Sequence, residues 1–591
     1  MSLTQRVPDL HAPEPAVSPP RTLSRQVPAF AARALVALAA LAVAAALVAE
    51  FRGMLNPDAG WFLYCSNAYA HGRRLYVDLL EINPPLAFWL DLPAVGLHAV
   101  TGWPLITAFR LYVVVVAALS ATGAFALTRG LFPGGANGER GPARVAFGCA
   151  LAFVAFPLLG GAFGQREHLA LLLALPWLAL SARRAARLDC AAWVAAACGA
   201  CAGLAMAIKP QYFAVWAAVA WCRSRYLSRG ELLRVEDAAV AVVAGVYGLL
   251  VLTLTPEYLE FVQRFGTSYL DFGRHSLGYM LVLQSSAFAC YVALAAWWIG
   301  RRAGRDPLAD VLAAAAAGFL AAAVMQHKGW SYHYVPARGC TVLLAAVVLA
   351  RAPAVRLPSA RRLAETLAGL VVATYVLLVG VDLYWRIRVP FIPYQAAIRR
   401  ALDRSGPARS LILLSSDPAD AFPLVLERGL DYQSPLHHLW VLTDAYAGGF
   451  GSSRRVAPRS RAEMSEGERL VFDRVSAALA AHRPDLLLIE SPPLNARRTG
   501  YPGGFDYVRY FSRVPGAAAM LREYAPVASV EDLLILRRTS TTAVASSCHD
   551  DHPGSRASAA ARAVPAGRMA IDTSHAASRC RQPGASDAMR T

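Results

Sequence analysis

Long apolar runs separated by short polar segments dominate the chain between about residues 30 and 385. Several runs approach or reach the roughly 20 residues that an α-helix needs to cross a bilayer. We predict eleven membrane-spanning helices, over residues 31–48, 103–128, 145–160, 168–182, 190–208, 210–222, 237–254, 277–299, 308–325, 334–350 and 363–385. The predicted fold class is therefore a mainly α-helical, polytopic membrane protein.

Arginine clusters in the connecting segments support this set of helices. They follow every second predicted helix and consist of Arg129, Arg140 and Arg144; Arg183, Arg184 and Arg187; Arg223, Arg225, Arg229 and Arg234; Arg301, Arg302 and Arg305; and Arg351, Arg356, Arg361 and Arg362. By the positive-inside rule these loops are cytoplasmic, and so is the N-terminus. The helices at 168–182 and 210–222 are short for upright spans, but removing either one alone breaks the alternation.

The apolar segment 84–100 is treated differently from the eleven spans. It contains Asp91, Pro93 and His98, and counting it as a span would put the arginine clusters out of phase. We therefore expect an interfacial or re-entrant helix on the outer face.

The segments on either side of the apolar region have other compositions. Residues 1–28 carry six prolines without apolar periodicity, which predicts a disordered cytoplasmic arm before a transmembrane domain at 29–387. Residues 388–540 have ordinary soluble composition, with expected strands at 410–417, 484–490 and 532–537 and a helix at 467–482. We expect a small α/β domain there, outside the membrane, and a disordered tail at 541–591.

Composition narrows the class of protein. Apolar residues make up 56% of the chain and charged residues 17%, a balance that is unusual for a soluble protein of this size. The net charge of +18 comes mainly from the arginine clusters, so it reports topology and gives no reason to expect a nucleic-acid partner. The ten cysteines lie mostly in apolar segments, so no disulfide framework is expected.

The first outer loop contains the leading candidate for catalysis, Asp58. This carboxylate follows the first predicted helix and precedes an aromatic-rich amphipathic stretch. Partial burial there suits a general base that still reaches groups in water. The alternative is that Asp58 caps the N-terminus of the next helix.

The second outer loop ends in four consecutive polar residues, Gln165-Arg-Glu-His168, next to a glycine-rich turn. Arg166 and Glu167 are ionisable groups squeezed between two apolar helices. They either belong to a site or are the polar ends of the two spans.

The lysines form a third candidate group. Only Lys209 and Lys328 are lysines among 58 basic residues, and both lie at predicted outer helix ends. A compact ammonium group there suits contact with a phosphate, although two residues can share a location by chance. Lys328 belongs to a polar block, Gln326-His-Lys-Gly-Trp-Ser-Tyr-His333, which an interfacial aromatic belt explains only in part.

Three segments carry a resemblance to a known family. They are Asp58-Ala-Gly-Trp-Phe-Leu-Tyr, Gly72-Arg-Arg-Leu-Tyr-Val-Asp and Asn83-Pro-Pro-Leu. Over roughly residues 30–340 the chain resembles the glycosyltransferase C superfamily, which includes protein O-mannosyltransferases, aminoarabinose-to-lipid-A transferases and lipopolysaccharide-core transferases. The resemblance implies an inverting glycosyltransferase that moves a hexose or pentose from a polyprenyl-phosphate carrier to a glycolipid, glycan or protein acceptor. It also implies a bacterial inner-membrane protein with an extracytoplasmic active site.

The resemblance also implies roles for individual residues. Asp58 matches the family's catalytic carboxylate, with Glu167 as a second catalytic residue. The phosphate of the donor would contact Lys209, Lys328, Arg166, Arg73 and Arg74, and other substrate groups would contact Asp78, Asn83, His168, Tyr332 and His333. Family members often carry an Asp or an Asp-x-Asp pair in the second loop, where this chain has only Glu167. A divalent ion held by Asp58 and Glu167 is therefore left open.

Two other classes of protein remain as alternatives. A membrane transporter or lipid flippase would concentrate polar residues near the bilayer midplane, whereas the polar clusters here lie at predicted outer helix ends. A scaffold protein whose outer domain does the work would have no need of Asp58 or Lys328.

Overall fold

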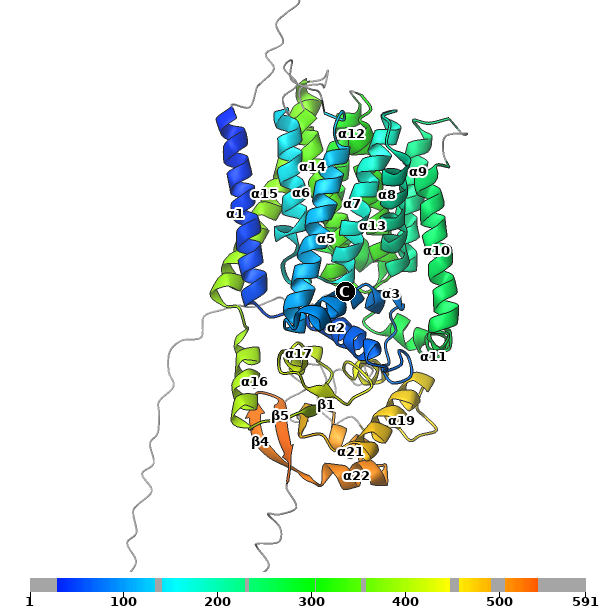
Figure 1. Cartoon of the computed structure of the whole chain (residues 1–591), viewed down its shortest axis with the longest axis vertical. Helices are drawn as coiled ribbons and strands as arrows, with labels where there is room; N and C mark the ends of the chain where they lie inside the picture. The colour runs from blue at the N-terminus through cyan, green and yellow to red at the C-terminus, as the bar shows by residue number, and fades with distance from the viewer. Residues whose placement is uncertain are drawn as a thin grey trace, which may run out of the picture. The chain divides into compact units, whose positions relative to one another are not determined.

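The computed structural model describes residues 29–132, 141–228, 233–302, 304–351, 358–446, 457–490 and 505–539 of the 591-residue chain. The predicted arm at 1–28 and the predicted tail at 541–591 lie outside the described residues. The described part consists of a helical bundle with a smaller region built around a β-sheet at one end (Figure 1).

Each predicted span coincides with a helix of the bundle. These helices are α1 (Ala29–Arg52), α5 (Leu105–Leu127), α6 (Pro142–Ala155, continued by a 3₁₀ turn at Pro157–Ala162), α7 (Arg166–Ala185), α8 (Ala192–Ile208), α9 (Phe213–Ser224), α10 (Val235–Leu254), α12 (Ser285–Arg301), α13 (Pro307–Met325), α14 (Val335–Arg351) and α15 (Pro358–Arg388). The helix expected at 277–299 starts only at Ser285, after a π-helical turn at Tyr279–Leu283.

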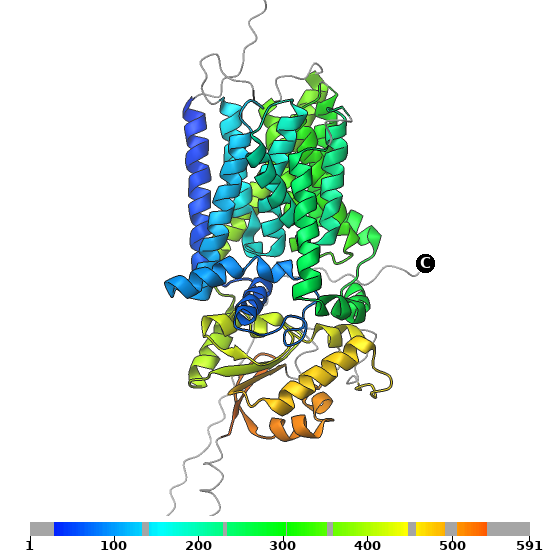
Figure 2. The same cartoon turned by 45° about the vertical axis from the view of Figure 1, so that its right-hand side comes forward.

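Seven apolar segments of the described chain are long enough to cross a membrane. They are Ala31–Arg52, Leu105–Leu127, Pro142–Ala162, Val235–Leu254, Pro307–Met325, Ser331–Ala350 and Ser359–Arg404. The other four helices, α7, α8, α9 and α12, are shorter or more polar, and they run alongside the seven in both views (Figures 1 and 2). The number of eleven spans therefore stays a prediction.

The segment 84–100 does not form a continuous helix. It is divided into α3 (Leu86–Trp89) and α4 (Leu92–Thr101), which pack with α2 (Pro57–Ala70) and α5. These short helices lie across the end of the bundle, between it and the sheet region (Figure 2). The expected interfacial or re-entrant position on the outer face stays a prediction.

The sheet region begins with α16 (Pro393–Arg404) and contains five strands. They are β1 (Ser410–Leu414), β2 (Asp431–Tyr432), β3 (Leu486–Glu490), β4 (Tyr524–Val530) and β5 (Leu533–Arg538), in the order β2-β1-β3-β5-β4. β1 is parallel to β2 and β3, whereas β5 is antiparallel to β3 and β4. β1, β3 and β5 are the three expected strands, and α19 (Glu466–Ala481) is the expected helix, so the small α/β region is confirmed.

The hydrophobic core of the sheet region includes α2. Trp61 is fully buried and lies parallel to the His437 ring at a centroid distance of 5.1 Å. The Tyr64 hydroxyl accepts a hydrogen bond from the Tyr432 amide and donates one to the Tyr432 carbonyl, both at 3.0 Å. Helix α2, which comes from the first outer loop, therefore belongs to the core of the sheet region. The proposed domain boundary at 387/388 stays a prediction.

The helix ends that carry the described members of the arginine clusters lie at the other end of the bundle, away from the sheet (Figure 1). Arg183 donates to the carbonyl of Leu127 at 3.2 Å, so the loops after α5 and α7 lie next to each other. Arg223 donates to both oxygens of Asp237, at 2.7 and 2.8 Å. The clusters therefore share one end of the molecule, and the assignment of that end to the cytoplasm stays a prediction.

Candidate active site

The N-terminus of α2 fixes the position of Asp58. The Asn56 side chain caps this helix, accepting from the amides of Asp58 and Ala59 at 3.0 and 3.4 Å, and Pro57 occupies the first helical position. Asn56 Nδ2 also donates to the Gly161 carbonyl at 3.0 Å, which ties α2 to the second loop. Asn56 therefore fills the capping role considered for Asp58, and the Asp58 carboxylate is left to face the pocket.

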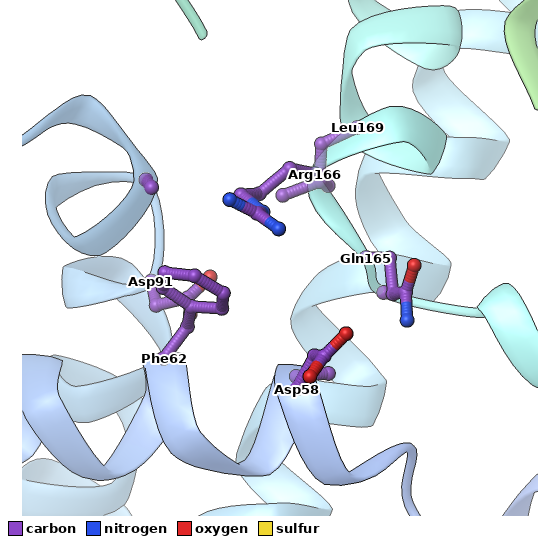
Figure 3. Close-up of a pocket in the computed structure, with 9 residues that line it drawn as sticks. Asp58, Phe62, Asp91, Gln165, Arg166 and Leu169 are labelled. Carbon is purple, nitrogen blue, oxygen red and sulfur yellow. The ribbon is translucent and has the colours of Figure 1, made fainter. Parts of the chain in front are cut away.

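A pocket lies where three segments far apart in the sequence meet (Figure 3). α2 contributes Asp58, Ala59 and Phe62; the α3–α4 corner contributes Ala87 and Asp91; and the start of α7 contributes Gly164, Gln165, Arg166 and Leu169. The pocket thus joins the first-loop carboxylate to the polar run of the second loop. The sequence predicts that the first-loop carboxylate and the second-loop polar run lie on the same face, but it does not predict that they meet.

Arg166 is the cation of this pocket. Its guanidinium carbon lies 4.2 Å from the centroid of the Phe62 ring, a cation–π contact. The side chain is buried, and its Nη1 atom has no hydrogen-bond partner among the described residues. Arg166 is also the first residue of α7, so the free amides and positive dipole end of a 20-residue helix lie beside it.

Gly164 allows α7 to start at this place. Its φ of +74° favours glycine, and a Cβ atom here would lie 2.6 Å from Cε1 of Phe109. Its amide donates to Nδ1 of His168 at 3.1 Å, which fixes the first turn of α7. The predicted site residue His168 therefore supports the turn from behind.

A buried ion pair lies behind Arg166. Lys209 Nζ donates to Glu167 Oε1 at 2.5 Å and to Gln326 Oε1 at 2.9 Å. His333 Nε2 lies 3.9 Å from the same Glu167 oxygen. Glu167 Oε2 and both ring nitrogens of His333 have no hydrogen-bond partner within the described ranges. The structure thus brings together Glu167, Lys209 and His333 from three separate parts of the sequence.

The surroundings of Asp58 favour its neutral form. Burial raises the pKa of Asp58 to about 6, with Arg166 opposing this shift and the carboxylates of Glu81 and Glu167 adding to it. Its side chain has no hydrogen-bond or ion-pair partner among the described residues. A carboxylate of this kind is still ionised at neutral pH and is a stronger base than an ordinary aspartate.

Two other candidate cations, Lys328 and Arg73, bind protein groups outside the pocket. Lys328 Nζ donates to the carbonyls of Tyr269, Leu270 (3.2 Å) and Phe272 (2.5 Å), which holds the end of α11 (Glu257–Asp271). Arg73 pairs with Asp431 at 3.0 Å, joining the first loop to β2. Neither residue lines the pocket.

The remaining first-loop candidates also bond to near neighbours. The exposed Arg74 lies 3.6 Å from Asp78, four residues further on. Asn83 Nδ2 donates to Glu81 Oε1 at 2.6 Å, and Glu81 Oε2 accepts from the Trp61 indole at 2.9 Å. Asn83 therefore belongs to a network that positions α2, and Arg74 and Asp78 form a surface turn.

Two residues near the site were not singled out from the sequence. Asp91 lines the pocket, yet in the sequence it served only as evidence against a span. Tyr269 lies within electrostatic range of Asp58, Arg166 and Glu167, and burial raises its pKa to about 12. Tyr332, which was predicted, lies close to the same charges. The sequence offered one indication of such a site residue, an acid inside an apolar segment, and that acid is Asp91.

A divalent metal does not fit the described residues well. They contain no group of three or more His, Cys, Asp or Glu side chains placed to hold a metal ion. Glu167 already pairs with Lys209, which competes with a cation for its charge. No step of the chemistry below is therefore assigned to a metal.

Comparisons with known proteins define the class of fold. No protein-family model and no curated protein matches the sequence. Solved structures do match, and they show that the chain shares the fold of ArnT. Two of the matched structures are of ArnT from Cupriavidus metallidurans. The one bound to undecaprenyl phosphate gives a TM-score of 0.51 at 16% identity and covers 86% of this chain and 99% of ArnT. The apo structure gives 0.50 at 16% identity, covering 86% and 98%. At this identity the likeness shows the fold alone.

Proposed function

We propose that the protein is an inverting glycosyltransferase that takes a sugar from a polyprenyl-phosphate carrier. The observation that carries the proposal is one pocket in which the Asp58 carboxylate faces Arg166 at the N-terminus of α7. Such a pocket offers a base beside an anion-binding group, the two elements needed to displace a phosphate from a sugar. The fold of ArnT, which has been solved with undecaprenyl phosphate, supports the same class of donor.

The donor phosphate would bind at the start of α7. A helix N-terminus offers unpaired amides and a positive dipole, both of which favour an anion. Arg166 adds a guanidinium with an unpartnered nitrogen in a buried setting, where charge interactions are stronger than in water. The pair Lys209 and Glu167 lies directly behind and holds the first turn of α7 in place.

Transfer would then occur by a single displacement. The acceptor hydroxyl gives its proton to Asp58 as its oxygen forms a bond to the anomeric carbon. The bond from that carbon to the phosphate oxygen breaks, and its electron pair leaves with the polyprenyl phosphate, whose charge Arg166 stabilises. Attack from the face opposite the phosphate inverts the configuration of the anomeric carbon.

The other predicted site residues keep narrower roles in this proposal. Tyr332 lies close to Asp58, Glu167 and Arg166, and His333 lies beside Glu167; both are proposed to contact the sugar or acceptor. Lys328 supports Tyr269 through the α11 carbonyls, and Arg73 joins the first loop to the sheet region. The acceptor is a glycolipid, a glycan or a protein.

We place the pocket and the sheet region on the extracytoplasmic side of a bacterial inner membrane. The argument is the gathering of the arginine clusters at the opposite end of the bundle, as the positive-inside rule requires of the cytoplasmic end. Reporter fusions after Arg187 and Arg305 should indicate cytoplasm, and fusions within 505–530 should indicate the outside. The reverse result would remove this placement.

Replacement of the base tests the reaction. Asp58→Asn should lower transfer from a polyprenyl-phosphate sugar by about 10²–10⁴-fold, because the positioned base is lost. The fold should survive, since Asn56 caps α2 and the new side chain has nearly the same shape. The measurement is turnover by purified protein in detergent without any ion gradient.

Asp403→Asn is the matched control. Asp403 is an exposed aspartate of α16 that pairs with Arg428 at 2.7 Å and does not line the pocket. The control should turn over at the wild-type rate. Equal activity of Asp58→Asn and Asp403→Asn would remove Asp58 from the mechanism. Carrier movement across vesicles without any sugar transfer would instead favour a flippase.

A further inference from the structure

Asp91 is a buried carboxyl group without an assigned role. It is 4% exposed, lies at the corner between α3 and α4, and lines the pocket together with Asp58 and Arg166. Although it precedes α4, its side chain makes no capping hydrogen bond. Among the described residues it has no hydrogen-bond or ion-pair partner. Neither helix capping nor a salt bridge therefore explains an acid at this place.

The pocket places Asp91 within reach of the phosphate site. In Figure 3 the Arg166 side chain extends from α7 into the space that Asp58 and Asp91 border. Phe62 forms the floor under the guanidinium and lies in the same pocket as both carboxyl groups. A phosphate bound to Arg166 would therefore meet Asp91 as well as the guanidinium.

The charge balance of the pocket decides which form of Asp91 suits an anion. Within the described ranges Arg166 is the one cation that lines the pocket, and it already faces Asp58. A second ionised carboxylate would repel a phosphate, whereas a protonated carboxyl group donates a hydrogen bond to it.

Burial favours the protonated form. It raises the pKa of Asp91 well above the ordinary aspartate value, and Arg166 opposes this shift only in part. The other groups that face Asp91 are Asp58 on α2, an acid, and Tyr112 on α5, a phenol. Such surroundings favour a carboxyl group that holds its proton and acts as a donor.

We propose that Asp91 is a second phosphate-binding residue, which donates a hydrogen bond from its protonated carboxyl group to the carrier phosphate held by Arg166. The inference rests on the proposed function, since it takes the ligand to be a polyprenyl phosphate. It adds that an acidic side chain, Asp91, helps Arg166 to bind the phosphate.

Two substitutions of different chemistry test the proposal. Asp91→Asn keeps a hydrogen-bond donor of nearly the same shape, so it should bind undecaprenyl phosphate within about two-fold of wild type. Asp91→Ala removes the donor and should weaken binding by about ten-fold or more, as expected for one hydrogen bond to a charged group. Affinity is measured with undecaprenyl phosphate in detergent, and thermal melting confirms that both variants are folded.

The pH profile gives a second measurement. Wild-type affinity for undecaprenyl phosphate should fall as rising pH removes the Asp91 proton, and Asp91→Asn should lack that fall. Loss of binding by Asp91→Asn to the level of Asp91→Ala would overturn the proposal, because an ionised carboxylate would then be needed. Wild-type affinity in Asp91→Ala would overturn it too. If the wild-type protein neither binds the carrier nor transfers sugar, the proposed function itself fails, which is a separate outcome.

Discussion

The two ends of the helical bundle both contain buried charge, but they treat it differently. At the arginine end, Arg223 is paired with Asp237, Arg184 pairs with Glu236 at 3.1 Å, and Arg301 pairs with Asp310 at 3.3 Å. At the pocket end, Arg166, Glu167 and His333 each have a buried polar atom without a partner in the described part of the chain.

This difference separates structural charge from functional charge. A buried polar atom without a partner costs free energy, so a native protein tolerates several together mainly where a ligand completes them. The arginine end is neutralised by the protein's own carboxylates and holds neighbouring helices together. At the pocket end, Arg166 is buried but forms no ion pair with a carboxylate among the described residues. Neither the number of buried charges nor that of unpartnered polar atoms distinguishes the two ends, since Arg183 Nε at the arginine end also lacks a hydrogen bond among the described residues. The difference is that Arg184, Arg223 and Arg301 each have a carboxylate partner.

The sharpest way to break this comparison is to remove one arginine from each end. Arg166→Ala should lower kcat/KM by about 10²–10³-fold with little change in melting temperature, because it loses a group that stabilises the leaving phosphate. Arg223→Ala should instead destabilise the fold by about 3–5 kcal/mol, because Asp237 is left buried without its partner. Activity and thermal unfolding are measured on both proteins.

The added carrier provides the control for this pair. Undecaprenyl phosphate should raise the melting temperature of wild type and of the folded Arg223→Ala protein but not of Arg166→Ala. The comparison fails if Arg166→Ala unfolds as readily as Arg223→Ala, since Arg166 would then be structural as well.

An intermediate effect is expected from pH. Because the pKa of Asp58 is raised to about 6, the base is ionised above that pH and protonated below it. Activity should therefore fall by about ten-fold per pH unit below pH 6, a limb that lies well above the one an ordinary aspartate would give. The measurement is kcat/KM between pH 4.5 and 8. A constant rate down to pH 5 would contradict the assignment of Asp58 as base.

The smallest effect is expected at the first-loop arginines. Arg73 and Asp431 are both partly exposed, and such pairs contribute about 0.2–1 kcal/mol. Arg73→Ala should lower the melting temperature slightly and leave the affinity for undecaprenyl phosphate unchanged. Arg74→Ala is the matched control, because the exposed Arg74 reaches only its own turn. A ten-fold loss of carrier affinity in Arg73→Ala alone would return Arg73 to the phosphate site.

The sequence predicted the elements of the fold better than their contacts. Apolar periodicity and the phase of the arginine clusters located each bundle helix, because both signals are local in the sequence. The same holds for β1, β3 and α19. The packing of Trp61 against His437 was not predictable in this way, because it joins residues far apart in the chain and depends on the complete fold.

The candidate site shows the same limit. Asp58, Arg166 and Glu167 stood out as polar residues in apolar surroundings, and the structure brings all three to one place. Lys328 is also a polar residue in apolar surroundings, but its ammonium group binds backbone carbonyls at the end of α11. The sequence does not show whether such a group binds a ligand or the protein's own backbone. Asn56 was overlooked as the cap of α2 because the neighbouring aspartate is an equally good capping residue.

The contact between Tyr64 and Tyr432 also has a consequence for how the protein is made. These residues are 368 positions apart, and synthesis proceeds from the N-terminus, so α2 leaves the ribosome long before its partners in the sheet exist. The face of α2 that carries Trp61 and Tyr64 must wait, uncovered, until β2 has been synthesised and carried to the same side of the membrane. Asp58 lies on that helix, so under the proposed mechanism a truncated chain would lack a correctly positioned base. Nascent and prematurely terminated copies are therefore expected to be inactive until the whole chain has been delivered.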